Sequence, residues 1–383
     1  MENLMDGPLR VLEVISEANR GGAETWLLHA LRQVNRNQVA IDFLVYDEGQ
    51  GAYEKEFRDT GAKVFVCKGH RNLLRHFRNL RALIRRHGPY EIVHTHTDYF
   101  GGLVLLYAWL LGVRIRIAHS HNDTSVVDST AGLTRRLYIR LMKLLVGTFS
   151  TGGLGTSEAS AALMFGKDWR SDRRWRVIPS CVDLSAFLTH PDRRQVRAEL
   201  GIPDNAVVFG HVGRFVKQKN HEFLLRVAER LVFQDDRITF LLVGGGSDQK
   251  HIEDSVRARG LADRVIILSP RGDVPRLMLG AMDFFIFPSR HEGLGLALVE
   301  AQAAGLRCFV SATVPPEAIV VPSLVQRLSL SAGAEHWANS ILEQTSTPSS
   351  VCRKEALRTV LSSFDIRRNA AQLVDFYLAL ASR

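Results

Sequence analysis

The chain has 383 residues, of which 46% are hydrophobic and 23% are charged, so we expect a globular protein too long for one ordinary core. Residues 1–180 hold 25 Lys and Arg against 18 Asp and Glu, whereas residues 181–383 hold 24 against 22, within a net charge of +9. The basic excess of the first half favours phosphorylated ligands or an anionic membrane surface.

Neither the cysteines nor the apolar segments indicate secretion or membrane insertion. The four cysteines, Cys67, Cys181, Cys308 and Cys352, have the spacing of neither a disulfide framework nor a metal site. The N-terminus lacks the layout of a signal peptide, and the longest apolar run, Gly101–Val113, is too short to cross a bilayer. We expect a cytoplasmic protein, with a peripheral position at the inner face of the cytoplasmic membrane as an extension of that hypothesis.

Short apolar runs alternate with helix-length segments through the first half of the chain. Leu9–Ile15 is a predicted strand, and the turn Gly21-Gly22 leads into a helical pattern that ends near Val34. Further strands are predicted at Val39–Tyr46, Lys63–Cys67, Glu91–His94, Arg114–His119 and Thr148–Gly152. This alternation indicates a parallel, doubly wound sheet.

The alternation starts again after an expected interdomain turn at Arg176–Phe187. Predicted strands are Val207–Val212, Ile238–Val243, Val265–Leu268, Asp283–Phe287 and Arg307–Ser311, and predicted helices are Asn220–Val232, Ser247–Arg259, Asp273–Gly280 and Leu296–Ala304. Glu343–Ser350 is expected to be a loop and Asp365–Ala381 an amphipathic helix. We therefore predict an N-terminal domain over residues 1–180, a C-terminal domain over 181–364 and a final helix over 365–383.

One turn of the second half combines features that suit an anionic ligand. Glu292-Gly293-Leu294-Gly295 follows a buried strand and precedes a helix. The glycines let backbone approach a ligand, and the first N–H groups of a helix attract an anion. Glu300 lies about one turn into the helix, so two carboxylates can hold hydroxyl groups at different points of a ligand. A sugar nucleotide has that chemistry, although such a pattern by itself is usually only a tight turn.

A second turn, between the predicted strand at 207–212 and the next helix, carries positive charge. Arg214 and Lys219 follow Gly213 there, and two cations can neutralise a diphosphate leaving group. A solvated basic loop is the alternative interpretation. Gly244–Gly246 lacks the full dinucleotide fingerprint and is interpreted as another tight turn.

Four histidines stand at the ends of two predicted strands of the first half: His94, His96, His119 and His121. Open α/β sheets place ligands at the carboxyl ends of their strands. Two histidines two residues apart also suit a metal ion. Because no Asp-x-Asp diphosphate–metal motif occurs in the chain, we expect no metal and no cofactor.

Taken together, these motifs resemble those of the retaining GT-B glycosyltransferases of family 4, especially bacterial capsule and exopolysaccharide transferases. The resemblance extends from about Leu9 to Leu380, and its motifs are Arg214, Lys219, Glu292, Glu300 and the turn Gly21-Gly22-Ala23-Glu24. It implies two Rossmann-like domains facing a central cleft, an N-terminal acceptor domain, a C-terminal donor domain, and a last helix that crosses back to the N-terminal domain.

The resemblance also implies roles for these residues. Arg214 and Lys219 would stabilise the diphosphate of a nucleoside diphosphate sugar, with UDP as the expected nucleotide. Glu292 would hold sugar hydroxyls and Glu300 the ribose. The remaining donor contacts would come from Gly21, Gly22, Gly213, Arg271, Gly293, Leu294 and Gly295, with His94 and His96 near the acceptor or sugar. Either His119 or His121 would contact the donor sugar, and the spacing leaves open which.

Residues 71–86 contain six arginines and no acid. Their apolar residues, Leu73, Leu74, Phe77, Leu80, Leu83 and Ile84, would share one helical face. Such a helix could lie on an anionic membrane or pack into the core with a basic outer face. A second basic helix, with Arg135, Arg136, Arg140 and Lys143, favours the membrane.

The predicted activity is transfer of a sugar from a nucleoside diphosphate to a lipid-linked or saccharide acceptor, with no nucleic-acid partner. Two alternatives stay open. One is a sugar-nucleotide epimerase or hydrolase on the same fold, and the other is a catalytically silent protein that binds sugar nucleotide as a scaffold.

Overall fold

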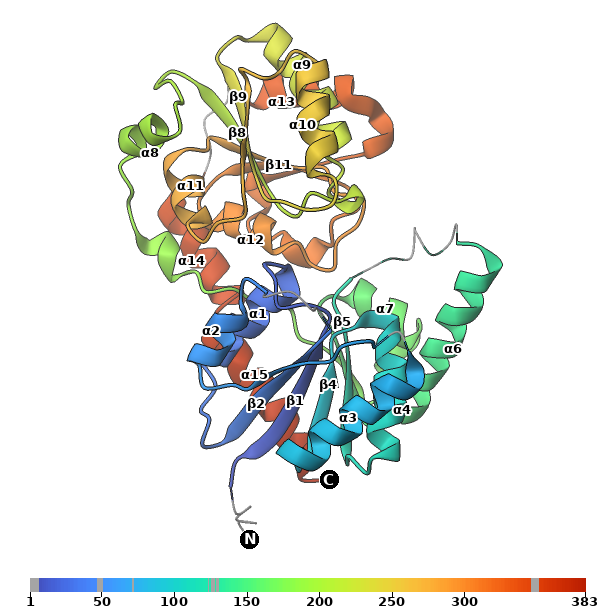
Figure 1. Ribbon diagram of the computed structural model, residues 1–383. Helices are drawn as coiled ribbons and strands as arrows, with labels where there is room; N and C mark the ends of the chain where they lie inside the picture. Colours follow the sequence, from blue (N-terminus) through green and yellow to red (C-terminus); the bar gives the residue numbers. More distant parts are fainter. Residues whose placement is uncertain are drawn as a thin grey trace. The chain divides into compact units, whose positions relative to one another are not determined.

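The computed structural model describes residues 7–46, 51–70, 72–122, 124, 128, 131–345 and 351–383 (Figure 1). The chain divides into two compact units. Residues 1–182 together with 366–383 form unit 1, and residues 183–365 form unit 2. Each unit contains one parallel sheet with helices packed on it, which confirms the predicted pair of Rossmann-like domains.

Unit 1 contains a seven-stranded parallel sheet with the order β3-β2-β1-β4-β5-β6-β7. The strands are β1 (Leu9–Ile15), β2 (Val39–Val45), β3 (Val64–Val66), β4 (Ile92–Thr95), β5 (Ile115–Ser120), β6 (Gly152–Gly155) and β7 (Trp175–Val177). The strand order reverses between β1 and β4, and ligands of open α/β sheets bind at such a switch point. The register there places Glu13 of β1 beside His94 of β4.

The helices of unit 1 are α1 (Gly22–Leu31), α2 (Glu54–Asp59), α3 (Leu73–His87), α4 (Gly101–Leu110), α6 (Leu133–Phe149), α7 (Glu158–Phe165) and α15 (Ile366–Ala381). The last of these, α15, packs against α1 although most of the chain separates them. Trp26 Nε1 donates a 2.6 Å hydrogen bond to Asn369 Oδ1 across that contact. The final helix therefore belongs to the core of unit 1.

Unit 2 contains a six-stranded parallel sheet with the order β10-β9-β8-β11-β12-β13. Its strands are β8 (Val207–Val212), β9 (Ile238–Val243), β10 (Val265–Leu268), β11 (Phe284–Phe287), β12 (Arg307–Ser311) and β13 (Val325–Leu328). Its helices are α8 (Arg193–Glu199), α9 (His221–Gln234), α10 (Gln249–Ala258), α11 (Val274–Gly280), α12 (Leu296–Ala303), α13 (Gly333–Thr345) and α14 (Arg353–Ser363). The strand order reverses again, between β8 and β11.

Two predicted elements differ from the structure, and two strands of the structure were not predicted. The predicted strand at Thr148–Gly152 is wrong in its first part, because α6 continues to Phe149, whose ring packs on Trp109 at a centroid distance of 5.1 Å. The predicted loop at Glu343–Ser350 is wrong for its first three residues, which finish α13, while residues 346–350 lie outside the described part. The short edge strands β7 and β13 were not predicted.

The apolar side of α3 faces the core of unit 1. Leu80 and Leu83 are buried, and Phe77 and Ile84 pack against the same hydrophobic cluster. Its arginines point outward, as Arg75, Arg78 and Arg85 do, and are exposed. The structure thus shows the core-packing interpretation for the middle and end of this helix, whereas the predicted single apolar face is wrong for Leu73 and Leu74, which are 55% and 78% exposed.

Candidate active site

Two loops of unit 2 meet at the carboxyl edge of its sheet because β8 and β11 are neighbours. The backbone N–H of Arg290 donates to the carbonyl of Gln218 (2.8 Å), and the Gln218 side-chain amide donates to the carbonyl of His291 (2.9 Å). The side-chain amide of Asn220 donates to the carbonyl of Pro288 (3.1 Å). Sequence reasoning missed Gln218 and Asn220, because nothing in a sequence indicates which loop a single amide will tie to another.

Lys219 and Glu292, 73 positions apart, form an ion pair between these loops. Lys219 Nζ lies 2.6 Å from Glu292 Oε1 and 4.7 Å from the centroid of the Phe287 ring. Glu292 is 5% exposed, so its carboxylate depends on this partner for compensation of its buried charge. Arg214 lies on the same loop as Lys219 and is exposed. The structure therefore places both predicted cations and the first predicted acid at one edge of the sheet.

The start of α12 supplies backbone donors beside this pair. Gly295 precedes the helix with φ 95°, a left-handed conformation that favours glycine, and no side chain caps the first turn. Gly293 and Leu294 are buried in the loop before it. An uncapped helix start next to a lysine is a suitable position for an anionic group.

Glu300 lies on α12, five residues beyond Gly295. Its burial raises the pKa of its carboxyl from 4.5 to about 7. It therefore loses its proton near neutral pH, and an ionised carboxylate at this position can accept hydrogen bonds from hydroxyl groups of a ligand.

The glycines at 244–246 have a packing role. A methyl group on Gly244 would lie 1.9 Å from the carbonyl oxygen of Gly213, and the N–H of Phe215 donates to the carbonyl of Gly245 (2.8 Å). They allow the loop after β9 to pack directly on the loop that carries Arg214. Arg271, on the loop after β10, is held by Asp273 in a two-point ion pair that includes a 2.8 Å contact between Nη2 and Oδ2.

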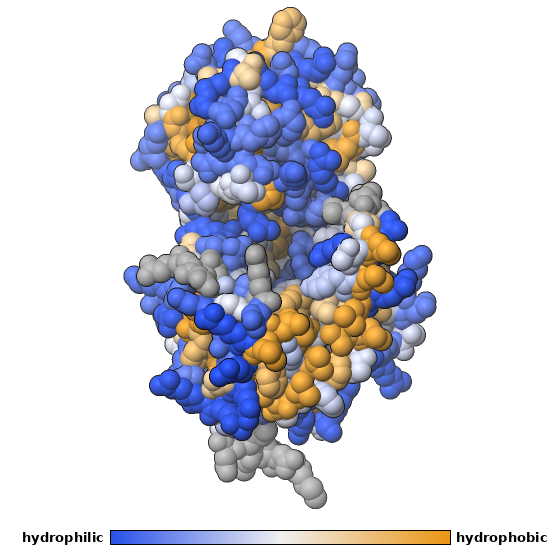
Figure 2. Space-filling model, turned by 45° about the vertical axis from the view of Figure 1, so that its right-hand side comes forward, coloured by the Kyte–Doolittle hydropathy of each residue, from blue (hydrophilic) through white to orange (hydrophobic). Residues whose placement is uncertain are grey.

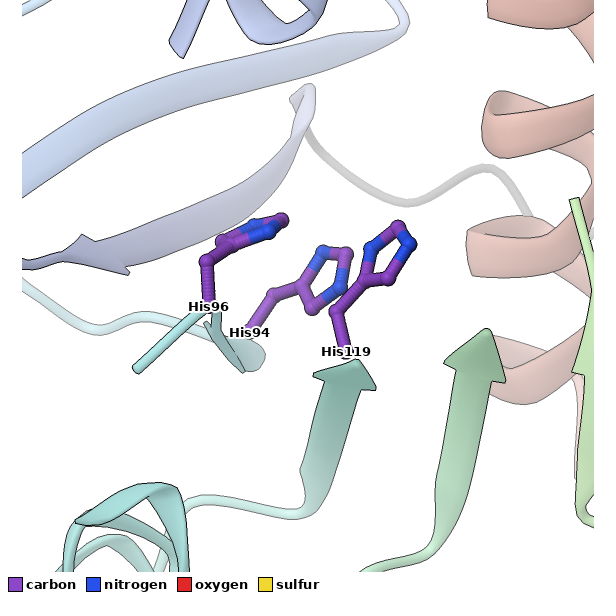
Figure 3. A group of neighbouring side chains, drawn as sticks. All are labelled: His94, His96 and His119. Carbon is purple, nitrogen blue, oxygen red and sulfur yellow. The ribbon is translucent and has the colours of Figure 1, made fainter. Parts of the chain in front are cut away.

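The four predicted histidines, His94, His96, His119 and His121, come together at the carboxyl ends of β4 and β5. Figure 3 shows the rings of His94, His96 and His119 side by side, with His119 leaving the arrowhead end of its strand. The ring of His121 stacks on that of His119 at a centroid distance of 4.1 Å. His94, His96 and His119 are buried, whereas His121 is partly exposed. The predicted gathering of these side chains is therefore present in the structure.

A buried acid organises this cluster. Glu13 on β1 has no exposed surface and accepts hydrogen bonds from His96 Nε2 (2.7 Å) and from the hydroxyl of Tyr377 on α15 (2.7 Å). Burial acts to raise the pKa of Glu13, but the nearby His94 and His96 lower it well below its usual range. Sequence reasoning missed Glu13 although it carried a signal, since an acid within the apolar run Leu9–Ile15 needs buried partners.

The cluster fits a metal ion poorly. His94, His96 and His119 offer ligand atoms within 4.8 Å of one another. However, His96 Nε2 is bonded to Glu13 and His96 Nδ1 lies 2.7 Å from His121 Nε2. Within the described part of this cluster, unpartnered buried ring nitrogens are found on His94 and His119. A metal ion bound by His94, His96 and His119 would therefore have to displace one of the two hydrogen bonds of His96.

Gly21 and Gly22 lie at the start of α1. Gly21 precedes the helix, and a methyl group there would lie 2.2 Å from Glu24 Oε2, so the Glu24 carboxylate folds back over the helix start. A negative charge at that end interacts favourably with the helix dipole. Glu24 thus has a structural role in α1, and the glycine leaves room for it.

Comparison with known proteins assigns a family to both units. Residues 20–186 match the family Glycosyltransferase Family 4, and residues 192–351 match Glycosyl transferases group 1. EpsF of Bacillus subtilis is 33% identical over 373 residues, covering 96% of each chain. CapH of Staphylococcus aureus, a capsular polysaccharide biosynthesis glycosyltransferase, is 24% identical over 297 residues, covering 76% of this chain and 78% of CapH.

An enzyme of Escherichia coli, UDP-Gal:alpha-D-GlcNAc-diphosphoundecaprenol alpha-1,3-galactosyltransferase, is 25% identical over 295 residues, covering 76% of this chain and 75% of its own. Among solved structures, HepE of Anabaena in complex with UDP-glucose aligns over 98% of this chain and 100% of HepE, with a TM-score of 0.80 and 19% identity. That likeness concerns the fold, which is GT-B. The chain therefore belongs to the family 4 glycosyltransferases and is related to enzymes of polysaccharide biosynthesis.

Proposed function

We propose that this protein is a retaining glycosyltransferase that moves a sugar from a UDP-linked donor to a lipid-linked or saccharide acceptor in cell-surface polysaccharide biosynthesis. The observation that carries the proposal is the Lys219–Glu292 pair beside the uncapped start of α12. The names of two relatives support its details, since the Escherichia coli enzyme uses UDP-Gal and a diphosphoundecaprenol acceptor and CapH makes capsular polysaccharide.

In the donor site, Arg214 and Lys219 would bind the diphosphate, together with the first N–H groups of α12. As the bond between the sugar's anomeric carbon and the diphosphate oxygen breaks, negative charge accumulates on that oxygen. Two cations and a helix start aimed at it lower the barrier by stabilising the charge. Glu292 would hold sugar hydroxyls, and Glu300 the ribose.

Retention of configuration would follow from attack on the same face. The acceptor hydroxyl forms the new bond to the anomeric carbon on the side that the diphosphate leaves, and its proton passes to the diphosphate oxygen. No side chain becomes covalently bound, and the positive charge comes from Arg214 and Lys219. We therefore propose that transfer requires no divalent ion, in agreement with the poor fit of the histidine cluster to a metal.

The decisive test incubates the purified protein with labelled sugar nucleotides, UDP-sugars first, and a membrane lipid extract. Label in the lipid or saccharide fraction supports the transferase. Altered or hydrolysed free sugar nucleotide indicates an epimerase or hydrolase instead, and binding without turnover indicates a scaffold. Comparison of the anomeric configuration of donor and product by NMR then decides between retention and inversion.

We also propose that the protein works at an anionic membrane surface, with α6 as the contact in place of α3. Leu133, Leu137, Leu141 and Leu144 form a stripe along α6 and are 74%, 54%, 51% and 64% exposed. Trp109 and Leu110, at the end of α4, are also more than half exposed and lie near the end of α6. Figure 2 shows hydrophobic residues gathered on this side of unit 1, with hydrophilic residues around them.

Basic residues flank this apolar stripe. Arg136 and Arg140 are exposed on α6 between its leucines. A helix with leucines on one face and arginines at its borders suits the interface of an anionic bilayer. Among the described residues, no helix combines the length and the apolar character needed to cross a membrane. A lipid-linked acceptor would be reached from such a surface position.

A further inference from the structure

We propose that Glu13 and His96 are positioning residues that fix the tautomer of His121, so that His121 Nδ1 accepts a hydrogen bond from a substrate hydroxyl. The inference rests on the proposed function, because it names the histidine of the cluster that contacts the sugar or the acceptor.

The Glu13 carboxylate is ionised and can only accept hydrogen bonds. The Tyr377 hydroxyl has one proton and donates it to Glu13 Oε1 at 2.7 Å. The same hydroxyl lies 2.7 Å from His94 Nδ1, so it accepts the proton of that nitrogen. Glu13 Oε2 is shared by His96 Nε2 at 2.7 Å and His94 Nδ1 at 3.2 Å, and His96 Nε2 must carry a proton because an ionised carboxylate can only accept.

The proton on His96 Nε2 determines the next hydrogen bond. Burial and the neighbouring His94 lower the pKa of His96 to about 4 although Glu13 acts in the opposite direction, so its ring is neutral at neutral pH. A neutral ring protonated at Nε2 has a lone pair on Nδ1. His96 Nδ1 lies 2.7 Å from His121 Nε2, and His121 Nε2 must be the donor.

His121 is then left with a lone pair on Nδ1. Its pKa is also lowered well below the usual value, first by burial and then by His96 and His94, so the ring is neutral. Hydrogen bonds to its Nδ1 are not found within the described part of the chain, and the residue is partly exposed. His119 is 1% exposed and stacked behind it. The hydrogen-bonded series Glu13–His96–His121 therefore leaves His121 Nδ1 as the nitrogen that can accept a hydrogen bond from a substrate hydroxyl.

Replacement of Glu13 by Gln should reverse the whole hydrogen-bonded series. With its carbonyl toward the Tyr377 hydroxyl, the Gln amide would turn its NH₂ toward His96 Nε2 and His94 Nδ1, so that both nitrogens become acceptors. His96 would then carry its proton on Nδ1 and donate to His121 Nε2, and His121 would carry its proton on Nδ1. A hydroxyl that donated to Nδ1 would lose its acceptor.

The first test reads the tautomer of His121 directly by NMR of the full-length protein labelled with ¹⁵N-histidine, with His121→Asn to assign the signals. We expect a proton on Nε2 in the parent and on Nδ1 in Glu13→Gln. Tyr377→Phe removes a donor from the same carboxylate without touching the hydrogen-bonded series, and it should leave the tautomer unchanged. An Nδ1-protonated parent would overturn the proposal, and so would an unchanged tautomer in Glu13→Leu, which removes the acceptor of His96 Nε2 altogether.

The second test is a double-mutant cycle on sugar transfer. Glu13→Gln and His121→Asn should each lower kcat by about tenfold or more, the value of one hydrogen bond, and the double variant should lose no more than the stronger single variant. If the loss of kcat in the double variant equalled the product of the two single losses, Glu13 and His121 would act independently, and the proposal would be contradicted. Asp42→Asn is the matched control, because Asp42 is a buried acid of the same sheet that accepts from Tyr90 and has no link to the histidines.

The two tests separate this proposal from the proposed function. The NMR test needs no substrate, so it tests the hydrogen-bonded series even if the parent protein transfers no sugar, an outcome that would overturn the proposed function instead. Measuring KM for the donor and for the acceptor separately in these variants shows which substrate carries the hydroxyl. Loss of a donor-sugar contact raises KM for the donor, and loss of an acceptor contact raises KM for the acceptor.

Discussion

At the scale of single residues, the cations of the loop after β8 differ in how they are held. Lys219 is paired with the buried Glu292, whereas Arg214 is exposed at the same edge of the sheet. A substitution at Lys219 therefore removes positive charge and also leaves a buried carboxylate uncompensated, which reduces stability. Because Arg214 is exposed, its substitution should disturb packing less than a substitution at Lys219.

Arg214→Ala should lower kcat by an amount that corresponds to about 2–4 kcal/mol of barrier, because a charge aimed at the leaving diphosphate is lost. Lys217→Ala is the control, since Lys217 is an exposed cation of the same loop. Turnover is measured with labelled donor, and circular dichroism checks the fold. Full activity of the Arg214→Ala/Lys219→Ala double variant in a folded protein would exclude this assignment of the diphosphate site.

Glu300 predicts a dependence of stability on pH. Its pKa is 4.5 in the unfolded chain and about 7 when folded, so between these values only the unfolded chain loses the proton. The free energy of unfolding should therefore fall as pH rises through this window, by about 3 kcal/mol, and level off above it. Glu300→Gln should lack this decrease in urea titrations at pH values from about 4 to 8. An identical decrease in the variant would show that another group is responsible.

At the scale of elements, we expect α6 to contribute more than α3 to membrane binding. Replacing Leu137, Leu141 and Leu144 by Gln should weaken binding to anionic vesicles at least about tenfold without loss of stability, because these side chains are exposed. Arg136→Gln with Arg140→Gln should mainly reduce the sensitivity to salt, at about 1 kcal/mol for each charge near the surface.

The matched control for these variants lies on α3. Arg75, Arg78 and Arg85 have exposed charges above a packed apolar face, so their replacement by Gln should affect vesicle binding less than the leucine variant does. Vesicle co-sedimentation with anionic and neutral lipid measures both sets. If the parent and the leucine variant bound anionic vesicles equally, α6 would not be the membrane contact.

The elements themselves could largely be predicted from the sequence. Strands such as Leu9–Ile15 and Val207–Val212 are continuous apolar runs between helical segments, and the structure has the same bounds. The proposed membrane-facing helix could not be identified in this way, because α3 and α6 both combine leucines with arginines. Both helices also pack into the core, through Leu80 and Leu83 of α3 and Met142 and Val146 of α6. The structure adds that α6 exposes four leucines, whereas α3 exposes two at its start. Ion pairs such as Lys219–Glu292 likewise depend on strand order, which the sequence pattern does not specify.

At the scale of the whole molecule, the proposed chemistry predicts independence from metals. Sugar transfer should persist after exhaustive treatment with a chelator, because Arg214 and Lys219 supply the charge that a divalent ion would otherwise provide. The measurement compares initial rates before and after chelation and after addition of Mg²⁺, Mn²⁺ or Zn²⁺. Complete loss of transfer that one metal restores would mean that the histidine cluster, or an acidic site, binds an essential ion.

The return of α15 to unit 1 also affects how the protein is made. The tyrosine that bonds to Glu13 follows it by 364 positions in the chain. Trp26 likewise forms its hydrogen bond only after Asn369 has been synthesised. Until α15 has been synthesised, the nascent unit 1 holds an acid whose hydrogen bonds are incomplete and an apolar surface that α15 does not yet cover. The first unit to be synthesised is thus the last to be completed, and a chain truncated before residue 366 should remain dependent on chaperones even though unit 2 is whole.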